Sequence, residues 1–107
     1  MPTISFSYND FQKLLGRKLP LSKFKDLAAL YAKAEVEAYD NKTDEIKVAL
    51  DDTNMPYLWC AEGLARLFRG VLGIEKGLPK IKVHNSSYKI LVDKSVKRIR
   101  PYIAAFV

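Results

Sequence analysis

The side chain with the most distinctive chemistry is the single thiol, Cys60, which directly follows the single tryptophan, Trp59. We predict a helix over residues 56–72, and the positive end of a helix dipole favours a thiolate, so the pair could form a reactive centre. A nucleophilic thiol also needs a base, and the one histidine, His84, lies far along the chain. We therefore favour a packed tryptophan beside an inert, buried cysteine. One cysteine cannot form an internal disulfide, and a single Cys and a single His are too few ligands for a typical zinc site.

Carboxylates before the same helix offer a second kind of chemistry. Asp51 and Asp52, with Glu62 as partner, could form a pair for acid–base catalysis. Adjacent residues of a strand point to opposite faces, so the sequence favours one aspartate in solvent and the other as the cap of the following helix. The glycines match neither G-x-G-x-x-G nor a P-loop, because Lys76-Gly77 has the reverse order. We therefore expect no catalytic set and no cofactor site in this chain.

Positive charge is concentrated in the last third of the chain. The 107 residues carry a formal net charge of +6; residues 1–74 hold 10 basic and 10 acidic side chains, and residues 75–107 hold 8 basic and 2 acidic ones. From charge alone we favour solvated side chains, because most of these residues alternate with apolar ones or lie in turns. The alternative is a surface that contacts nucleic-acid phosphates, formed by Lys80, Lys82, Lys89, Lys94, Lys97, Arg98 and Arg100.

Composition and local patterns predict a small α+β domain. Hydrophobic residues make up 49% of the chain and charged residues 28%, which is typical of a globular protein with one core. Residues 3–7 alternate polar and apolar side chains, as do residues 35–40 and 46–50 around a polar turn, so we predict a strand and a hairpin. No apolar run reaches the ~20 residues of a membrane helix, and the first residues lack a secretory signal. We expect a cytoplasmic protein that does not enter a membrane.

Capping residues mark two short helices between the first strand and the hairpin. Ser7 begins an S-x-x-D box with Asp10, and the helix that follows should end at Gly16. The next helix has Ser22 as its expected N-cap. Two short helices joined by a tight turn predict a helix-turn-helix-like corner within the α+β domain.

The remaining elements are a third helix, two further strands and a helical turn. Thr53 or Asn54 should cap the helix over residues 56–72, and Glu62 and Arg66 should pair on its outer face. Its inward-facing residues should be Leu58, Ala61, Leu64, Ala65, Phe68, Val71 and Leu72. Strands are predicted at KIKVH (80–84) and SYKILVD (87–93), a helical turn at 94–98, and the start of a truncated strand in the final PYIAAFV.

The stretch from Asp52 to Arg66 resembles a known signature. DTNMPYL at 52–58, followed by EGLAR at 62–66, is similar to the D-x-N-R-P-D-L…E-G-[IL]-A-R motif of the phenylalanyl-tRNA synthetase β-subunit family. The opening MPTISFSYNDFQKLLGRKL is similar to the family's N-terminus, and IRPY at 99–102 with Ala104-Ala105 to the start of its next domain. The resemblance is closest to the archaeal and eukaryotic form. Met55 and Tyr57 depart from it, since they stand where the family has Arg and Asp, so either the domain docks differently or the chain is a diverged paralogue.

The resemblance implies an architectural role. Residues 1–92 would be the helix-turn-helix-like N-terminal domain of the β subunit, related to DNA-binding domains, and residues 93–107 a linker and the first strand of the following domain. In the family, amino-acid activation belongs to the α subunit, and hydrolysis of mischarged tRNA to the β-subunit domain that follows this one, so this chain alone would be inactive. ATP and Mg would be cofactors of the whole synthetase, with none in this chain. Its partners would be the α subunit and the remaining β-subunit domains, and contact with tRNA stays open. The family-motif residues for structure and docking are Asp52, Asn54, Pro56, Leu58, Glu62, Gly63, Arg66, Arg100 and Pro101.

Two other classes of function remain open from the sequence. One is a stand-alone basic module that binds nucleic acid through the seven basic residues named above. The other is a protein-interaction paralogue that uses Met55, Tyr57 and the apolar end, residues 102–107, as its contact surface.

Overall fold

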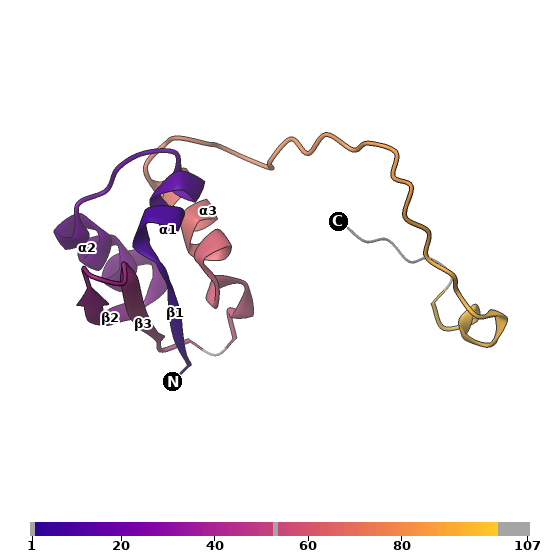
Figure 1. The fold of residues 1–107 in the computed structure, drawn as a ribbon, viewed down its shortest axis with the longest axis horizontal. Helices are drawn as coiled ribbons and strands as arrows, with labels where there is room; N and C mark the ends of the chain where they lie inside the picture. The colour runs from indigo at the N-terminus through magenta and orange to yellow at the C-terminus, as the bar shows by residue number, and fades with distance from the viewer. Residues whose placement is uncertain (1, 53, 101–107) are drawn as a thin grey trace.

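A three-stranded antiparallel sheet packs one face against the helices of the domain in the computed structural model, which describes residues 2–52 and 54–100 (Figure 1). The strands are β1 (Thr3–Ser7), β2 (Ala34–Asp40) and β3 (Glu45–Leu50), and their order in the sheet is β1-β3-β2. The predicted first strand and the predicted hairpin are both confirmed, as is the α+β fold class.

Pairing along β3 aligns the apolar residues of all three strands on the core face. Ile4 of β1 lies opposite Val48, which in turn lies opposite Val36 of β2. The register between β2 and β3 shifts between Val36 and Ala38, so the chain forms a β-bulge there. Because side chains alternate along a strand, this register places Ile46, Val48 and Leu50 of β3 together on the face that the helices cover, whereas Ala49, which is also buried, lies on the opposite face.

Helix α1 (Tyr8–Leu15) begins at the predicted cap. The Ser7 hydroxyl oxygen accepts a hydrogen bond from the backbone N–H of Asp10 at 3.1 Å. Asp44, in the turn between β2 and β3, caps the same helix from a distant part of the sequence, because its carboxylate accepts hydrogen bonds from the Ser7 hydroxyl and from the backbone N–H of Asn9. These hydrogen bonds lower the pKa of Asp44 below its ordinary value.

Helix α2 (Leu21–Ala32) follows α1 after a turn that starts at Gly16, whose φ of 83° is in the left-handed region that favours glycine. The prediction that Ser22 is the N-cap is wrong. Pro20 occupies that position, and its carbonyl accepts the first helical hydrogen bond from Phe24 N–H at 3.0 Å, so Ser22 already lies in the first turn. Both predicted helices form, and residues 16–20 connect them.

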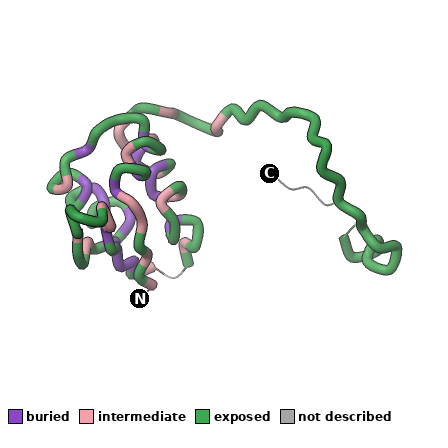
Figure 2. The backbone as a smooth tube through the Cα atoms, in the orientation of Figure 1, coloured by how far each residue is buried: buried purple, intermediate pink, exposed green. Residues whose placement is uncertain are grey.

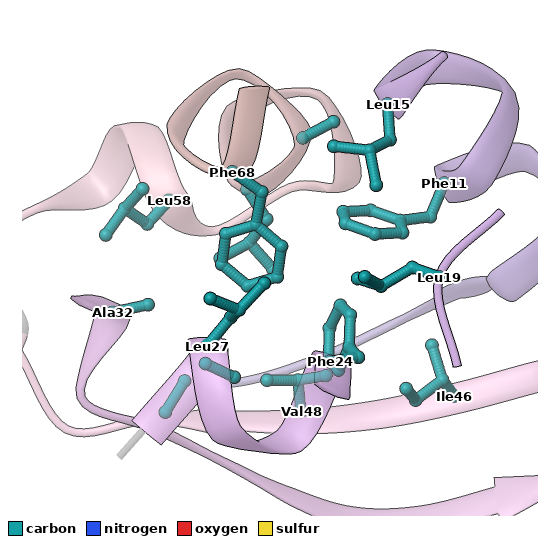
Figure 3. Close-up of a cluster of buried hydrophobic side chains, with 14 of the residues drawn as sticks. Phe11, Leu15, Leu19, Phe24, Leu27, Ala32, Ile46, Val48, Leu58 and Phe68 are labelled. Atoms are coloured by element: carbon teal, nitrogen blue, oxygen red, sulfur yellow. The ribbon is translucent and has the colours of Figure 1, made fainter. Parts of the chain in front are cut away.

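Aromatic rings fill the centre of the core (Figure 3). The ring of Phe24 lies 5.0 Å from that of Phe11 and 5.4 Å from that of Phe68, so α1, α2 and α3 meet at these side chains. Tyr8 is also buried, and its hydroxyl donates a hydrogen bond to the Leu19 carbonyl at 2.7 Å. Burial, with a smaller contribution from Tyr39, raises the pKa of Tyr8 to about 12.

The third predicted helix is shorter than expected. Its first turn is a separate 3₁₀ turn, η1 (Pro56–Leu58), and helix α3 (Ala61–Val71) begins only after Trp59 and Cys60. Of the predicted inward residues, Leu58, Leu64, Ala65 and Phe68 are buried, and Ala61, Val71 and Leu72 are half-buried. Asn54 is not the cap of this helix, and Thr53 lies outside the described residues.

The chain beyond residue 75 runs away from the folded body as an extended segment (Figures 1 and 2). Strands were predicted at 80–84 and 87–93, but neither forms, and every residue from 80 to 100 is exposed. Alternation of polar and apolar residues indicates only that a segment is suited to a sheet. Without a neighbouring strand to pair with, the backbone of such a segment stays exposed to water. The extended segment accounts for a Cα radius of gyration of 17.5 Å, against about 13 Å for a compact chain of this length.

The last element that the structure describes is a short turn near the end of the chain. A 3₁₀ turn, η2 (Lys94–Val96), confirms the helical turn predicted there, with the Asp93 carboxylate as its cap. The truncated strand predicted at PYIAAFV falls on residues 101–107, outside the described residues. In the described part of the chain, no helix is long and apolar enough to cross a membrane.

Candidate docking surface at the start of α3

The connection from β3 to α3 is anchored by apolar side chains. Leu58 is 2% exposed and belongs to the hydrophobic core (Figure 3). Met55 is half-buried and packs against that core. Tyr57, between them, is 63% exposed. The two departures from the family motif therefore differ in environment, because Met55 contributes to packing and Tyr57 faces solvent.

Gly63 is required by the way η1 crosses the first turn of α3. A Cβ atom added at Gly63 would lie 1.7 Å from the Tyr57 carbonyl oxygen, far inside van der Waals contact. Gly70, one heptad further along the same helix, is different, since the nearest atom to an added Cβ is the Glu75 carbonyl oxygen at 4.0 Å. The glycine of the motif thus allows η1 to lie against the helix.

Cys60 acts as the N-cap of α3. Its sulfur accepts a hydrogen bond from the backbone N–H of Gly63 at 3.4 Å, and its thiol lies 3.8 Å from the Tyr57 carbonyl oxygen. The prediction of a packed tryptophan beside a buried cysteine is wrong, since Cys60 is exposed and Trp59 is 37% exposed. The break between η1 and α3, which the helical pattern did not indicate, turns both residues outward. His84 belongs to the extended segment and forms no hydrogen bond with the thiol in the described residues.

The carboxylates of this region form neither the predicted cap nor the predicted pairs. Asp51 is exposed, as predicted for one of the two aspartates, but Asp52 makes an ion pair with Lys33 at 3.2 Å and caps neither η1 nor α3, so the capping prediction is wrong. In the described part of the chain no ion pair joins Glu62 to Arg66, although they stand four residues apart on α3. Their charged groups are therefore free to meet another molecule.

An open groove of about 700 Å³ lies along the outer side of η1 and α3. The motif residues Glu62, Gly63 and Arg66 line it, together with the exposed Tyr57. Cys60, Leu67 and Gly70 complete its lining. We call these seven residues the α3 groove; it combines apolar surface with one acidic and one basic side chain, which suits a protein contact better than a small polar ligand.

Arg69 fixes α3 against the rest of the domain. Its guanidinium donates one hydrogen bond to the Leu15 carbonyl at 3.0 Å and another to the Glu75 carboxylate at 2.9 Å. The Arg69 side chain is only 29% exposed. No local signal could reveal this role, because Leu15 lies 54 residues away in the sequence.

The other predicted site residues are spread over the surface. The seven basic candidates for nucleic-acid binding all lie in the exposed chain beyond residue 79, where η2 and its following turn bring Lys94, Lys97, Arg98 and Arg100 into one short stretch. Asn54 and Pro56 are exposed beside the α3 groove, and Pro101 lies outside the described residues. No cluster of three or more potential metal ligands occurs in residues 2–52 and 54–100.

Comparison with known proteins relates this domain to one protein family. The chain is 43% identical over 104 residues to the phenylalanine–tRNA ligase β subunit of Pyrococcus horikoshii, and 41% identical over 104 residues to that of Thermococcus kodakarensis. Both matches cover 95% of this chain and 18% of the relative. The crystal structure of an N-terminal fragment of the P. horikoshii phenylalanyl-tRNA synthetase β subunit matches with a TM-score of 0.71 and 42% identity, over 94% of this chain and 29% of that fragment. The chain is homologous to the N-terminal region of this β subunit.

The homology confirms the resemblance that the motif at Asp52 to Arg66 predicted. No family model matches the sequence. The chain spans less than a fifth of the length of the β subunits that it matches, so the homology concerns only their N-terminal region. Two residues of the β-subunit motif gain a physical explanation here, because Leu58 anchors η1 in the core and Gly63 lets η1 lie against α3.

Proposed function

We propose that this chain serves as the N-terminal architectural domain of a phenylalanine–tRNA ligase β subunit, with no catalytic site of its own. The observation that carries the proposal is the homology over 95% of the chain to β subunits. The family motif builds a packed junction with an outward groove rather than a constellation of nucleophile, base and oxyanion donors.

The partners in this proposal are the ligase α subunit and the remaining domains of the β subunit. The α3 groove is the surface that we assign to that contact, because its apolar area and the unpaired charges of Glu62 and Arg66 are available for another chain. ATP and Mg would serve the whole synthetase, in the cytoplasm, and would bind outside this chain. In this proposal the N-terminal domain spans residues 1–92, and residues 93–107 form a linker and the start of the next domain.

A chimeric β subunit tests the proposal. The N-terminal region of the P. horikoshii β subunit is replaced by this chain, and the chimera is co-expressed with its α subunit. We expect the complex to assemble and to attach phenylalanine to its tRNA, whereas a β subunit that lacks the region should assemble poorly. The isolated chain should neither aminoacylate tRNA nor hydrolyse mischarged tRNA. Equal assembly and activity of the chimera and of the truncated subunit would contradict an architectural role.

The exposed basic segment supports a second candidate, which is direct contact with tRNA or another nucleic acid. All seven basic residues from Lys80 to Arg100 are exposed and available to phosphates. Such binding should weaken as salt is added. For each phosphate contact, the logarithm of the association constant should fall by about 0.7 to 0.9 for every tenfold rise in salt concentration. A titration of the chain with tRNA at several salt concentrations tests this candidate, and a flat salt dependence or no binding at low salt eliminates it.

A further inference from the structure

Strand β2 has a free edge. It pairs with β3 on one side, and in the described residues no backbone hydrogen bond joins its other side to a neighbouring segment. Proteins commonly protect such edges with charges and bulges, and β2 has both. Its exposed side chains include Glu35, Glu37 and Asp40, and the bulge lies between Val36 and Ala38. The acidic side chains repel a negatively charged strand but attract one that carries positive charge.

An open groove of about 690 Å³ lies beside this edge, between α2 and β2. Ala29 of α2 and Ala34 and Val36 of β2 give it apolar surface. Charged side chains of both signs complete its lining: Lys25, Asp26, Lys33, Glu35 and Asp51. A strand added to β2 would therefore find the apolar surface of Ala29, Ala34 and Val36 within a charged rim on the α2 side. On the solvent side it would meet the carboxylates of Glu35 and Glu37.

The same chain contains a strand-like segment with the complementary pattern. In Lys80–His84, Lys80 and Lys82 share one face of an extended backbone, and Ile81 and Val83 share the other. Ile81 is 64% exposed and Val83 is 80% exposed, so neither is buried within its own chain. Within residues 2–52 and 54–100, neither this segment nor the outer edge of β2 has a pairing strand.

Geometry favours pairing between two molecules rather than within one. In Figure 1 the extended segment leaves the end of α3 and runs away from β2, which lies at the other end of the body. A segment that points outward can instead reach the edge of a second copy.

We propose that residues 80–84 add as a strand to the free edge of β2 in a second copy of this chain, and that the exchange is reciprocal. Ile81 and Val83 enter the α2–β2 groove beside Val36, and Lys80 and Lys82 lie along the solvent face near Glu35 and Glu37. Main-chain hydrogen bonds supply affinity and the alternating side chains supply register, as in other cases of strand addition. The reciprocal exchange gives a closed dimer with two equivalent contacts.

Charge exchange between the two surfaces tests the proposal with the full 107-residue chain. Sedimentation equilibrium should show a concentration-dependent dimer. Glu35→Lys with Glu37→Lys, or Lys80→Glu with Lys82→Glu, should each weaken dimerisation about tenfold or more, because like charges then face one another across the contact. All four substitutions together, or an equimolar mixture of the two double variants, should restore the dimer. Hydrogen exchange should slow in residues 80–84 and in β2 as the dimer forms.

Lys94→Glu with Lys97→Glu is the matched control, since it makes the same charge change in the same exposed region but outside the alternating segment. This control should dimerise like the original chain, and circular dichroism should show that all variants keep the folded body. A chain that remains monomeric through the micromolar range would overturn the proposal. This holds even if hydrogen exchange is slow in residues 80–84 of the monomer. A dimer that is insensitive to the charge exchange would also overturn it.

Discussion

Replacement of Gly63 by alanine should destabilise the domain even though alanine is the better helix former. In an unobstructed helix, glycine to alanine stabilises by about 0.5–1 kcal/mol. At Gly63 the new methyl group would lie 1.7 Å from the Tyr57 carbonyl oxygen and 2.8 Å from its carbonyl carbon, so η1 must move. Overpacking of this kind costs about 1–3 kcal/mol and occasionally more. Because backbone rather than a flexible side chain is in the way, we expect the upper end of that range.

The net effect of Gly63→Ala is then a loss of about 2 kcal/mol or more in the free energy of unfolding, after the gain in helix propensity is subtracted. For a domain of this size that corresponds to a fall of about 10 °C in melting temperature. Urea unfolding followed by far-ultraviolet circular dichroism measures the loss. The fluorescence of Trp59, which directly follows η1, reports separately whether the turn has moved.

Gly70→Ala is the matched control, because it lies in the same helix and its added methyl group would meet no atom closer than 4.0 Å. That variant should be as stable as the original chain or up to ~1 kcal/mol more stable. If the two variants had equal stability, η1 would not be pressed against α3, and our explanation of the motif glycine would be wrong.

Three further predictions follow from the packing and the titrating groups. Met55→Arg should lower the free energy of unfolding by about 1–3 kcal/mol, because Met55 packs against the core, whereas Tyr57→Asp should change it by less than ~0.5 kcal/mol; urea unfolding compares the two. Tyr8→Phe should cost about 1–3 kcal/mol by leaving the Leu19 carbonyl without its hydrogen bond. Because the pKa of Tyr8 is raised from 10.0 to about 12, the original chain should also lose stability as pH rises from 10 towards 12, and Tyr8→Phe should lack that contribution in pH-dependent melting. The pKa of Asp44 is lowered instead, so the effect of pH on stability has the opposite sign. The carboxylate contributes to the free energy of unfolding above pH 3.8, its ordinary pKa, and that contribution is lost as pH falls through the lower pKa of the folded state. Asp44→Asn should therefore show a melting temperature that depends less on pH in the acid range.

Each of these outcomes has a clear contrary result. Equal stabilities of Met55→Arg and Tyr57→Asp would mean that the two positions share an environment. An unchanged alkaline profile in Tyr8→Phe would mean that other groups govern stability there. An unchanged acid profile in Asp44→Asn would remove this carboxylate as the cap of α1.

The elements that the sequence predicted well are those with local signals. Alternation places Ile4 in β1 and Val48 in β3 on the core face, and Ser7 caps α1 through a residue only three positions away. The break between η1 and α3 has no such signal, because it depends on the burial of Leu58 and on the contact of η1 with Gly63. The helical periodicity alone therefore predicted one continuous helix.

The candidate site shows the same limit. The motif residues could be named from the sequence, but exposure of Cys60 and the ion pair between Asp52 and Lys33 depend on how β2, β3 and α3 are placed in space. The strands predicted at 80–84 and 87–93 failed for a related reason, since alternation identifies a segment suited to a sheet and does not supply the neighbouring strand.

The hydrogen bonds at both ends of α1 have a consequence for how the chain folds. Asp44 satisfies backbone and side-chain donors at the start of the helix, and Arg69 satisfies the Leu15 carbonyl at its end. The partners are separated by 35 to 54 residues in the sequence, so the Asp44 contacts need the hairpin to approach α1, and the Arg69 contact needs α3 to approach it. Long loops must close before these bonds are made, which slows folding relative to a domain of local contacts. In kinetic experiments, substitutions at Asp44 and Arg69 should therefore speed unfolding more than they slow folding, and the ends of α1 should be among the last parts of the domain to become ordered.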